Sequence, residues 1–378
     1  MSALSEENIG GGTPKTSIKE YWDGKIPWIQ SSDLQEHDVK NIRVNKRITE
    51  AAIKNSAAKL IPKNSLAIVM RVGVGKVSLI PFEYSTSQDF LSLSNLLVDK
   101  WFGTYLLYYK LQNELLALQG TSIKGITKKE VLDKYIYTPV NFKEQKLVGN
   151  IMSEIEKNIN LHRRKINILK KMKQEYLKLL FVAYKKSLPK IRFAEFNDKW
   201  ESNKLENYMS ERTERSAKGE LISVTIDSGV VKANSLQRKD NSSKDKSNYK
   251  IVRKGDIPYN SMRMWQGASG LSPHNGILSP AYTVLTPKAN TSGAFFIYLF
   301  KTELLLYEFK KYSQGLTSDT WNLKYPLLKT INVQIPGIHE QRAIGEFLTK
   351  FDEVILIHNK KVNRLLKMKQ VYLQKMFI

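Results

Sequence analysis

The sequence predicts an α+β protein with two homologous mixed α/β domains, separated by two long helices that pair as an antiparallel coiled coil. Three observations support this fold class. A stretch in the middle of the chain recurs at its end, both copies have helical spacing of apolar residues, and the region before each copy shows the same order of helix-like and strand-like segments. A length of 378 residues is enough for two or three domains.

The repeat is strict. Residues 144–181 and 340–377 align without a gap at a constant offset of 196, and fifteen of the 38 aligned residues are identical. The densest match is Lys171-Met172-Lys173-Gln174-x-Tyr176-Leu177 against Lys367-Met368-Lys369-Gln370-x-Tyr372-Leu373. One register over this length indicates an internal duplication.

Apolar residues recur in both copies at steps of three and four, which is typical of a helix with one apolar stripe. A helix of this length is ~57 Å long at 1.5 Å per residue, so a small domain cannot cover its stripe. We therefore expect the two helices to pack on each other. The two histidines of the stripe are interpreted as polar residues that fix the register. The predicted helix interface consists of Ile155, Ile159, His162, Ile166, Leu169, Tyr176, Phe351, Ile355, His358, Val362, Leu365 and Tyr372.

The duplication divides the chain into a first domain (1–143), a first long helix with its tail (144–186), a second domain (187–339) and a second long helix (340–378). Both domains are expected to contain an aromatic helix and then a short strand before a proline, at 101–118 and 134–140 in the first and at 294–312 and 330–335 in the second. The loops between these segments differ. This pattern indicates two related binding surfaces with different targets.

The charge favours a polyanionic partner, most simply nucleic acid: Lys and Arg number 60 against 36 Asp and Glu, a net charge of +24. The absence of cysteine excludes disulfides, thiolate zinc sites and cysteine nucleophiles. The five scattered histidines argue against a metal site. The first residues contain no apolar signal segment, and the longest apolar run, Ala294–Phe300, is too short to span a membrane. A cytoplasmic location is expected.

Motifs of self-contained enzymes are missing. Gly73-Val74-Gly75-Lys76 lacks the spacing of a phosphate-binding loop, and Gly10-Gly11-Gly12 is not preceded by the strand of a dinucleotide site. Asp256-Ile257-Pro258-Tyr259 lacks the second proline of an amino-methyltransferase motif. We therefore predict no catalytic and no metal-binding residue, and no enzyme activity of the chain by itself.

Polar and basic residues on predicted loops are the candidates for DNA contacts, because Arg, Lys, Gln, Ser and Thr read base edges and phosphates. The stretch Arg238–Lys254 is the most basic, although a merely solvated insertion would look the same. The candidates in the first domain are Thr13, Lys15, Gln30, Ser31, Arg71, Lys76, Gln88, Thr121, Ser122 and Lys124. Those in the second domain are Arg238, Lys239, Lys244, Arg263, Gln266, Thr317, Ser318 and Thr320.

Two groups of motifs remain. The first is the opening Gly11-Gly12-Thr13-Pro14-Lys15 with Tyr21-Trp22-x-Gly24-x-Ile26-Pro27-Trp28-Ile29. The second consists of the helix entries (Pro139 with Glu144-Gln145, Pro336 with Glu340-Gln341) and the Lys-Met-Lys-Gln-x-Tyr-Leu blocks. Together these motifs resemble the specificity (S) subunits of type I restriction-modification enzymes, over almost the whole chain. The opening is similar to the start of that family's target recognition domains, and the entries and blocks are similar to its helices.

This resemblance implies two target recognition domains that each read one half of a bipartite, asymmetric double-stranded DNA site, and a helix pair that sets the distance between them. It implies two methyltransferase (M) subunits that methylate adenine from S-adenosylmethionine, and two restriction (R) subunits that use ATP and Mg. The chain itself would bind no cofactor. One departure concerns the second domain, whose first clear strand is expected only at 220–226. The first domain therefore looks trimmed at its N-terminus, or differs in kind.

An alternative from another class is a free-standing coiled-coil DNA-binding regulator without methyltransferase partners. Such a regulator would bind its own operator as a monomer or homodimer, whereas a specificity subunit would form a defined complex with methyltransferase subunits. A self-contained nuclease or methyltransferase is disfavoured by the missing motifs.

Overall fold

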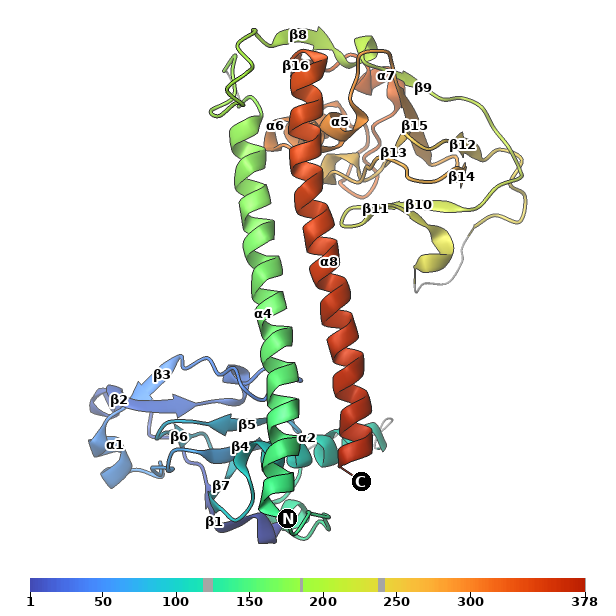
Figure 1. Cartoon of the computed structure of the whole chain (residues 1–378). Coiled ribbons are helices and arrows are strands. Elements are labelled where there is room, and N and C mark those ends of the chain that lie inside the picture. Colours follow the sequence, from blue (N-terminus) through green and yellow to red (C-terminus); the bar gives the residue numbers. More distant parts are fainter. Residues whose placement is uncertain (118–124, 184–185, 237–241, 378) are drawn as a thin grey trace. The chain divides into compact units, whose positions relative to one another are not determined.

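The computed structural model describes residues 1–117, 125–183, 186–236 and 242–377. The chain forms two compact units: unit 1 is Met1–Arg164 with His358–Ile378, and unit 2 is Lys165–Ile357. Each unit therefore combines one mixed module with a part of both long helices, α4 (Phe142–Leu180) and α8 (Ile338–Met376) (Figure 1).

The module of unit 1 contains two sheets. One is four-stranded and antiparallel in the order β1-β7-β4-β5, and the other has the order β3-β2-β6 with β2 and β6 parallel. Strands β4 and β5 are buried along their whole length, as expected of short apolar runs bounded by turns. The strands are β1 (Ser5–Gly10), β2 (Trp22–Ile29), β3 (Lys46–Ile48), β4 (Ser65–Val69), β5 (Val77–Ile80), β6 (Ser85–Thr86) and β7 (Phe90–Leu96).

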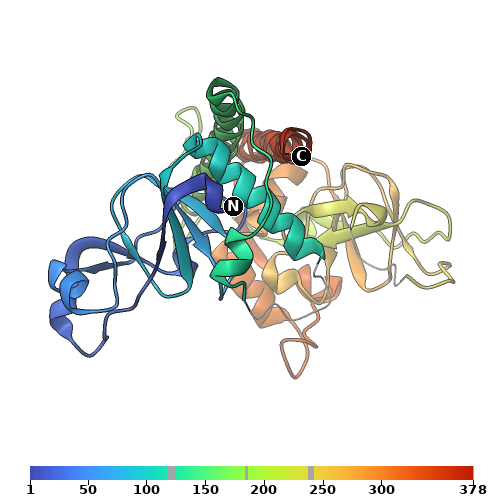
Figure 2. The ribbon, with the colours of Figure 1, turned by 90° about the horizontal axis from the view of Figure 1, so that it is seen from below.

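Helix α2 (Lys100–Ala117) covers the four-stranded sheet and supplies the centre of the unit 1 core. Its Phe102 ring contacts Phe377 at a centroid distance of 5.3 Å, so the C-terminal end of α8 packs beside α2 (Figure 2). The two other helices of the module are α1 (Glu50–Asn55) and α3 (Lys128–Leu132).

Unit 2 repeats the central strands. Its sheet β13-β15-β9 has the same antiparallel order as β4-β7-β1, and the match of β5 is reduced to a single bridge between Tyr259 and Ser269. The strands are β8 (Glu201–Lys204), β9 (Met209–Glu211), β10 (Ile222–Thr225), β11 (Gly229–Lys232), β12 (Lys250–Val252), β13 (Ile257–Asn260), β14 (Gly276–Leu278), β15 (Tyr282–Pro287) and β16 (Asn332–Ile335). The short helices are α5 (Gly293–Leu299), α6 (Glu303–Tyr312) and α7 (Tyr325–Leu328).

Four expectations about local structure are wrong. No strand was expected before Gly10-Gly11-Gly12, but β1 leads directly into these glycines. The helix expected over 294–312 is two helices, because Thr302 caps α6 by accepting a hydrogen bond from the Leu305 N–H. The strand expected over 134–140 is absent from the described chain, since nothing pairs with that segment. The first strand of the second domain, expected at 220–226, is β8, and β9 also precedes that segment.

The long helices pack antiparallel within each unit, because partner numbers run in opposite directions. In unit 1, Glu156 pairs with Lys369 and His162 contacts His358. In unit 2, Lys173 pairs with Asp352 and the Tyr176 ring contacts Phe347. The predicted fold class is confirmed.

Candidate nucleic-acid interface

Backbone hydrogen bonds join the loops of unit 1 that contain candidate DNA contacts. The Gly12 N–H donates to the Thr86 carbonyl (2.9 Å) and the Ser87 N–H to the Ile29 carbonyl (3.0 Å). The Met70 N–H donates to the Asp89 carbonyl (2.7 Å), which places the start of the 71–76 loop beside the same edge. We call loops 11–15, 30–34, 71–76 and 86–89 reading edge 1.

Some polar groups of reading edge 1 hold its loops in place, and others are exposed. The Lys76 ammonium donates to the carbonyls of Ser31 (3.1 Å) and Leu34 (2.9 Å), so it holds the 30–34 turn. The Thr13 hydroxyl donates to the Gln88 side chain (3.0 Å) in an exposed position. Exposed Lys15 and Arg71 form no ion pair with a described residue. Of the candidates, Gln30 caps the 31–33 turn together with Asp33.

Two glycines of the opening motif allow loop 11–15 to pack closely against neighbouring backbone atoms. A Cβ on Gly11 would lie 2.0 Å from the Ser87 carbonyl oxygen, and one on Gly12 would lie 1.9 Å from that of Ala57. The buried Trp28 indole N–H donates to the Gly12 carbonyl (3.1 Å) and fixes this loop against β2. The Gly-Gly-Thr-Pro motif is therefore a packing requirement that positions Thr13.

We expect Gly12→Ala to lower the free energy of unfolding by ~1–3 kcal/mol, because either the loop or residue 57 must move. Gly10→Ala is the matched control, since nothing lies within 4 Å of its Cβ position. Urea denaturation followed by tryptophan fluorescence compares the two variants. Equal midpoints for both would contradict the packing role.

The matching loops of unit 2 also meet. The Leu323 N–H donates to the Ser261 carbonyl (2.9 Å), and the Trp265 and Trp321 rings contact edge to face at 5.2 Å. The Arg263 guanidinium lies 3.7 Å from Asp319. We call loops 261–267 and 314–322 reading edge 2; they contain the candidates Arg263, Gln266, Thr317, Ser318 and Thr320.

Sequence reasoning missed Trp321 and Lys310 at reading edge 2. The Lys310 ammonium lies 5.3 Å from the centroid of the Trp321 ring, a cation–π contact at the surface. The only signal in the sequence was that Trp321 directly follows the polar turn 317–320. Trp265 is half-buried against the core and also faces Trp321.

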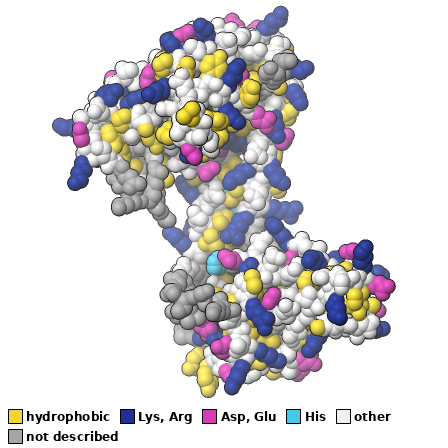
Figure 3. Space-filling model, turned by 180° about the vertical axis from the view of Figure 1, so that it is seen from behind, with side chains coloured by type: hydrophobic (Ala, Val, Ile, Leu, Met, Phe, Trp, Pro, Cys, Tyr) yellow, Lys and Arg dark blue, Asp and Glu magenta, His cyan; other side chains and the backbone are white. Residues whose placement is uncertain are grey.

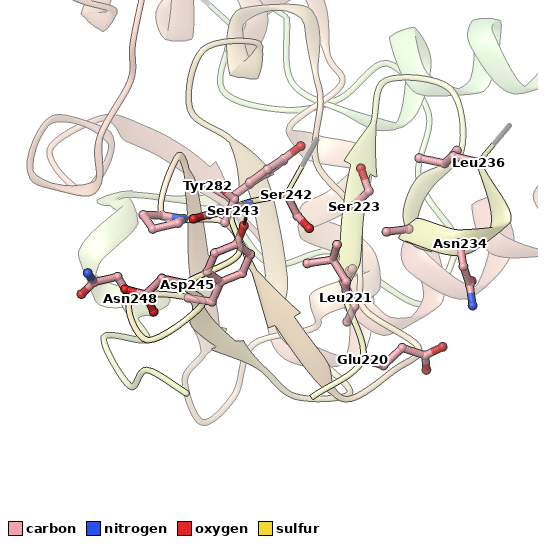
Figure 4. Close-up of a pocket in the computed structure, with 15 residues that line it drawn as sticks. Glu220, Leu221, Ser223, Asn234, Leu236, Ser242, Ser243, Asp245, Asn248 and Tyr282 are labelled. Carbon is pink, nitrogen blue, oxygen red and sulfur yellow. Dashed lines mark hydrogen bonds between the residues drawn. The ribbon is translucent and has the colours of Figure 1, made fainter. Parts of the chain in front are cut away.

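A second surface of unit 2 is a hollow of about 970 Å³ that both polar and apolar side chains line. Figure 4 shows one wall formed by loop 242–249 with Tyr282, and another formed by β10 with Asn234 and Leu236. Lys244 belongs to this loop and has no described contact with reading edge 2. Two basic residues of the stretch 238–254 are ion-paired, Lys250 with Glu211 (3.2 Å) and Arg253 with Glu214 (2.7 Å).

Five candidates lie outside the described residues: Thr121, Ser122, Lys124, Arg238 and Lys239. On the face shown in Figure 3, Lys and Arg side chains are spread over the surface and mixed with Asp and Glu. The positive charge is therefore distributed over that face. In the described part of the chain, no helix is long and apolar enough to cross a membrane.

Polar side-chain pairs between α4 and α8 occur at matching positions of the two repeat copies. We call residues at matching positions of the two copies twins. His162 and His358 are twins, and their Nδ1 atoms lie 3.0 Å apart. Around them, Ile155, Ile159, Ile166, Ile355 and Val362 are buried, whereas Leu169, Tyr176, Phe351, Leu365 and Tyr372 are half-buried. Met172, one step of three after Leu169, is 42% exposed.

The ion pairs Glu156–Lys369 and Asp352–Lys173 are also twins, but their surroundings differ. In unit 1 the side chains are 1% and 5% exposed, and burial raises the pKa of the Glu156 carboxyl above its ordinary value. In unit 2 the Lys173 ammonium lies 2.5 Å from Asp352, whose side chain is 48% exposed.

Two of the identical residues of the repeat, a glutamine and a glycine, attach each module to its long helix. The Gln145 side chain accepts from the Asp99 N–H (2.9 Å) at the start of α2 and donates to the Pro139 carbonyl (2.7 Å). Its twin Gln341 accepts from the Ser292 N–H (3.0 Å) at the start of α5 and donates to the Pro336 carbonyl (2.9 Å).

About one turn after each glutamine, a glycine allows the long helix to contact the helix of its module, α2 in the case of α4 and α5 in the case of α8. A Cβ on Gly149 would lie 2.6 Å from the Phe102 nitrogen, and one on its twin Gly345 would lie 2.8 Å from the Phe295 nitrogen. The glutamine and the glycine at the entry of each long helix are therefore an anchor for the helix of its module.

Comparison with protein families agrees with this twofold design. The family described as "Type I restriction modification DNA specificity domain" matches twice, at residues 6–171 and 197–367. The chain belongs to this family. The resemblance found in the sequence is thereby confirmed.

Other members of the specificity family are similar to this chain. The type I restriction enzyme MjaIX specificity subunit of Methanocaldococcus jannaschii is 30% identical over 188 residues, 47% of this chain and 42% of that protein. The EcoR124I/EcoR124II specificity subunit of Escherichia coli is 31% identical over 186 residues, 46% and 45% of the two chains. These alignments span less than half of the relatives, while the M. jannaschii MjaVIII specificity subunit aligns over 96% of this chain and 87% of its own, at 24% identity.

Solved structures show the same fold. The S subunit of a type I restriction-modification system from M. genitalium has a TM-score of 0.65 at 18% identity, covering 100% of this chain and 94% of that one. A chain from a study of complex assembly and conformational transition of the type I R-M system has a TM-score of 0.52 at 16% identity, covering 99% and 96%.

Proposed function

We propose that this chain is the DNA sequence-recognition subunit of a type I restriction-modification complex, in which each module reads one half of a bipartite, asymmetric site. The observation that carries the proposal is the double match of the specificity family, once in each module. The two modules share central strands and helix anchors but differ in their reading loops. A common framework with unlike loops suits the reading of two different half-sites.

The chemistry of the reading edges supports DNA as the ligand. At reading edge 1, the exposed cations of Lys15 and Arg71 suit phosphate contacts, and the Thr13–Gln88 pair offers donors and acceptors for base edges. At reading edge 2, Gln266 and the hydroxyls of the 317–320 turn have the same capacity. The net charge of +24 would add a salt-dependent attraction to any DNA.

The chemistry of modification and cleavage would belong to partner subunits. Two methyltransferase subunits would supply adenine methylation from S-adenosylmethionine, and two restriction subunits would supply ATP- and Mg-dependent cleavage. This chain would select the site and hold the assembly, with no bond-making step of its own. The double family match does not favour the free-standing regulator, and the following experiment separates the two functions.

The test is to co-express the chain with the methyltransferase subunit of its own system and to map methylated adenines across a genome. The proposal expects methylation that depends on this chain and falls in a motif of two half-sites with a fixed gap. A regulator would bind DNA alone and leave methylation unchanged when its gene is deleted. Absence of any dependent methylation with a stable complex would contradict the proposal.

Replacing residues 5–96 by the corresponding part of another family member should change one half-site and leave the other half-site and the gap unchanged. This segment carries reading edge 1 from β1 to β7, while α2 and its Gln145 anchor are retained. Methylation mapping of the hybrid gives the result. A motif altered in both halves would show that the modules do not read independently.

A further inference from the structure

An apolar side chain is fully exposed on loop 314–322 of reading edge 2. This residue is Leu316, and the next most exposed large hydrophobic residue in the described part of unit 2 is Tyr307, at 61%. A single exposed leucine is common on protein surfaces and needs no function by itself. Leu316 is distinguished by the structure of the loop that carries it and by the side chains of the same reading edge.

The loop that carries Leu316 is closed by its own hydrogen bonds. At its base, the Gln314 N–H donates to the Asn322 carbonyl (3.1 Å) and the Asn322 N–H to the Gln314 carbonyl (2.8 Å). Nearer its tip, the Thr317 N–H donates to the Thr320 hydroxyl (3.1 Å) and the Thr320 N–H to the Thr317 carbonyl (2.9 Å). Leu316 lies between these two sets of bonds, so its backbone is constrained while its side chain remains in water.

The residue before Leu316 must be a glycine. Gly315 has a φ of +143°, a conformation that other residues rarely adopt, and a Cβ at this position would lie 2.6 Å from the Thr320 carbonyl oxygen. Gly315 therefore allows the two sides of the loop to approach each other directly before Leu316. The loop has a defined shape that exposes this leucine.

Reading edge 2 places an aromatic pair and two cations in the neighbourhood of this loop. The Trp321 ring contacts Trp265 edge to face, and the Lys310 ammonium lies 5.3 Å from its centroid. The side chains of Arg263 and its partner Asp319 are 40% and 85% exposed, at 3.7 Å from each other. An ion pair this exposed is weak, so the Arg263 guanidinium can exchange the carboxylate for a phosphate.

We propose that Leu316 is a wedge that inserts between two stacked base pairs of the half-site read by unit 2. This inference rests on the proposed function. Proteins that bind the minor groove insert leucine and other apolar side chains into base steps, which unstacks the bases in part and kinks the duplex. Insertion would remove the Leu316 side chain from water, and Arg263 and Lys310 would be available for the phosphates of the kinked segment.

A wedge contributes specificity without a hydrogen bond to any base. The free energy needed to open a base step depends on its sequence, and the pyrimidine–purine steps TA and CA/TG are kinked or unstacked most easily. The half-site of unit 2, or the base pairs directly beside it, should therefore contain such a step. Leu316 would determine the preference at this step, while the polar groups of reading edge 2 contact base edges.

The test uses the complex of the full chain with its methyltransferase subunit, and duplexes that contain the mapped motif. In the half-site that replacement of residues 5–96 leaves unchanged, 2-aminopurine replaces one purine at a time, the methylated adenine excepted. Binding should raise the fluorescence at one pyrimidine–purine step, where the base is unstacked. Leu316→Ala should abolish this rise and weaken binding about fivefold to tenfold, since burial of a leucine side chain is lost. Leu316→Met should retain most of the rise, because methionine is also an apolar wedge.

Ile226→Ala is the matched control. Ile226 is an aliphatic residue of unit 2 that is 44% exposed, lies between β10 and β11 and does not belong to reading edge 2. This variant should keep the full rise and the full affinity.

The outcomes separate the wedge from the proposed function. If methylation depends on the chain, equal rises for Leu316→Ala and Ile226→Ala, or no rise at any purine, overturn the wedge alone. Loss of the methyltransferase subunit from the Leu316→Ala complex would also overturn it, because Leu316 would then be a protein contact. Without chain-dependent methylation, both proposals are wrong.

Discussion

Replacing Lys369 by methionine should lower the stability of unit 1 by about 3–5 kcal/mol, since it leaves the buried Glu156 carboxylate without its counter-charge. Glu156 is 1% exposed, and water cannot replace the lost ammonium. The substitution also removes a hydrogen bond from Lys369 to the His37 carbonyl (3.1 Å), which connects α8 with the 34–42 loop. Hydrogen exchange of the 142–164 part of α4 measures the loss in unit 1.

The repeat provides a matched control in Lys173→Met. Its partner Asp352 is half-exposed and also accepts a hydrogen bond from the Tyr298 hydroxyl (2.7 Å), so the expected cost is within ~1 kcal/mol. Adding Glu156→Leu to Lys369→Met should recover much of the loss, because the buried charge is then gone. Similar losses for Lys369→Met and Lys173→Met would show that burial does not set the strength of these pairs.

The long helices could be predicted from the sequence because their signal is local and repeated. Apolar residues at steps of three and four and a strict offset identify both copies, and the helices begin at Phe142 and Ile338, two residues before the repeat. The functions of the identical residues were not predictable. Gln145 and Gly149 act on the start of α2, which lies some forty residues earlier, and only the fold brings them together.

Strands were harder because a strand needs a partner. Residues 134–140 alternate like a strand but pair with nothing described, whereas β8, with the polar sequence Glu-Ser-Asn-Lys, is a strand because β16 lies beside it. The same reason limits the candidate site. Thr13 and Gln88 meet through the pairing of distant segments, and Lys76, a candidate for DNA contact, instead donates to carbonyls of its own module.

Four residues inserted into both long helices, after Arg164 in α4 and after Ile357 in α8, should lengthen the gap between the half-sites by one or two base pairs. Both helices contribute to both units. Both must therefore be lengthened equally if each unit is to keep its own contacts between α4 and α8. Four residues add ~6 Å and ~40° of rotation. One base pair of B-DNA adds ~3.4 Å and about 34°.

The insertion into one helix alone is the informative contrast. Four residues inserted after Ile159 in α4 alone would move His162 away from His358 and shift α4 relative to α8 within unit 1. We therefore expect lower stability of unit 1 and loss of methylation. The paired insertion leaves both reading edges untouched, and mapped methylation should therefore show the same two half-sites at a new distance. Full methylation at the original gap would refute the proposal that the helix pair sets the spacing, because ~6 Å of added helix between the units could not then leave their reading edges at the same separation.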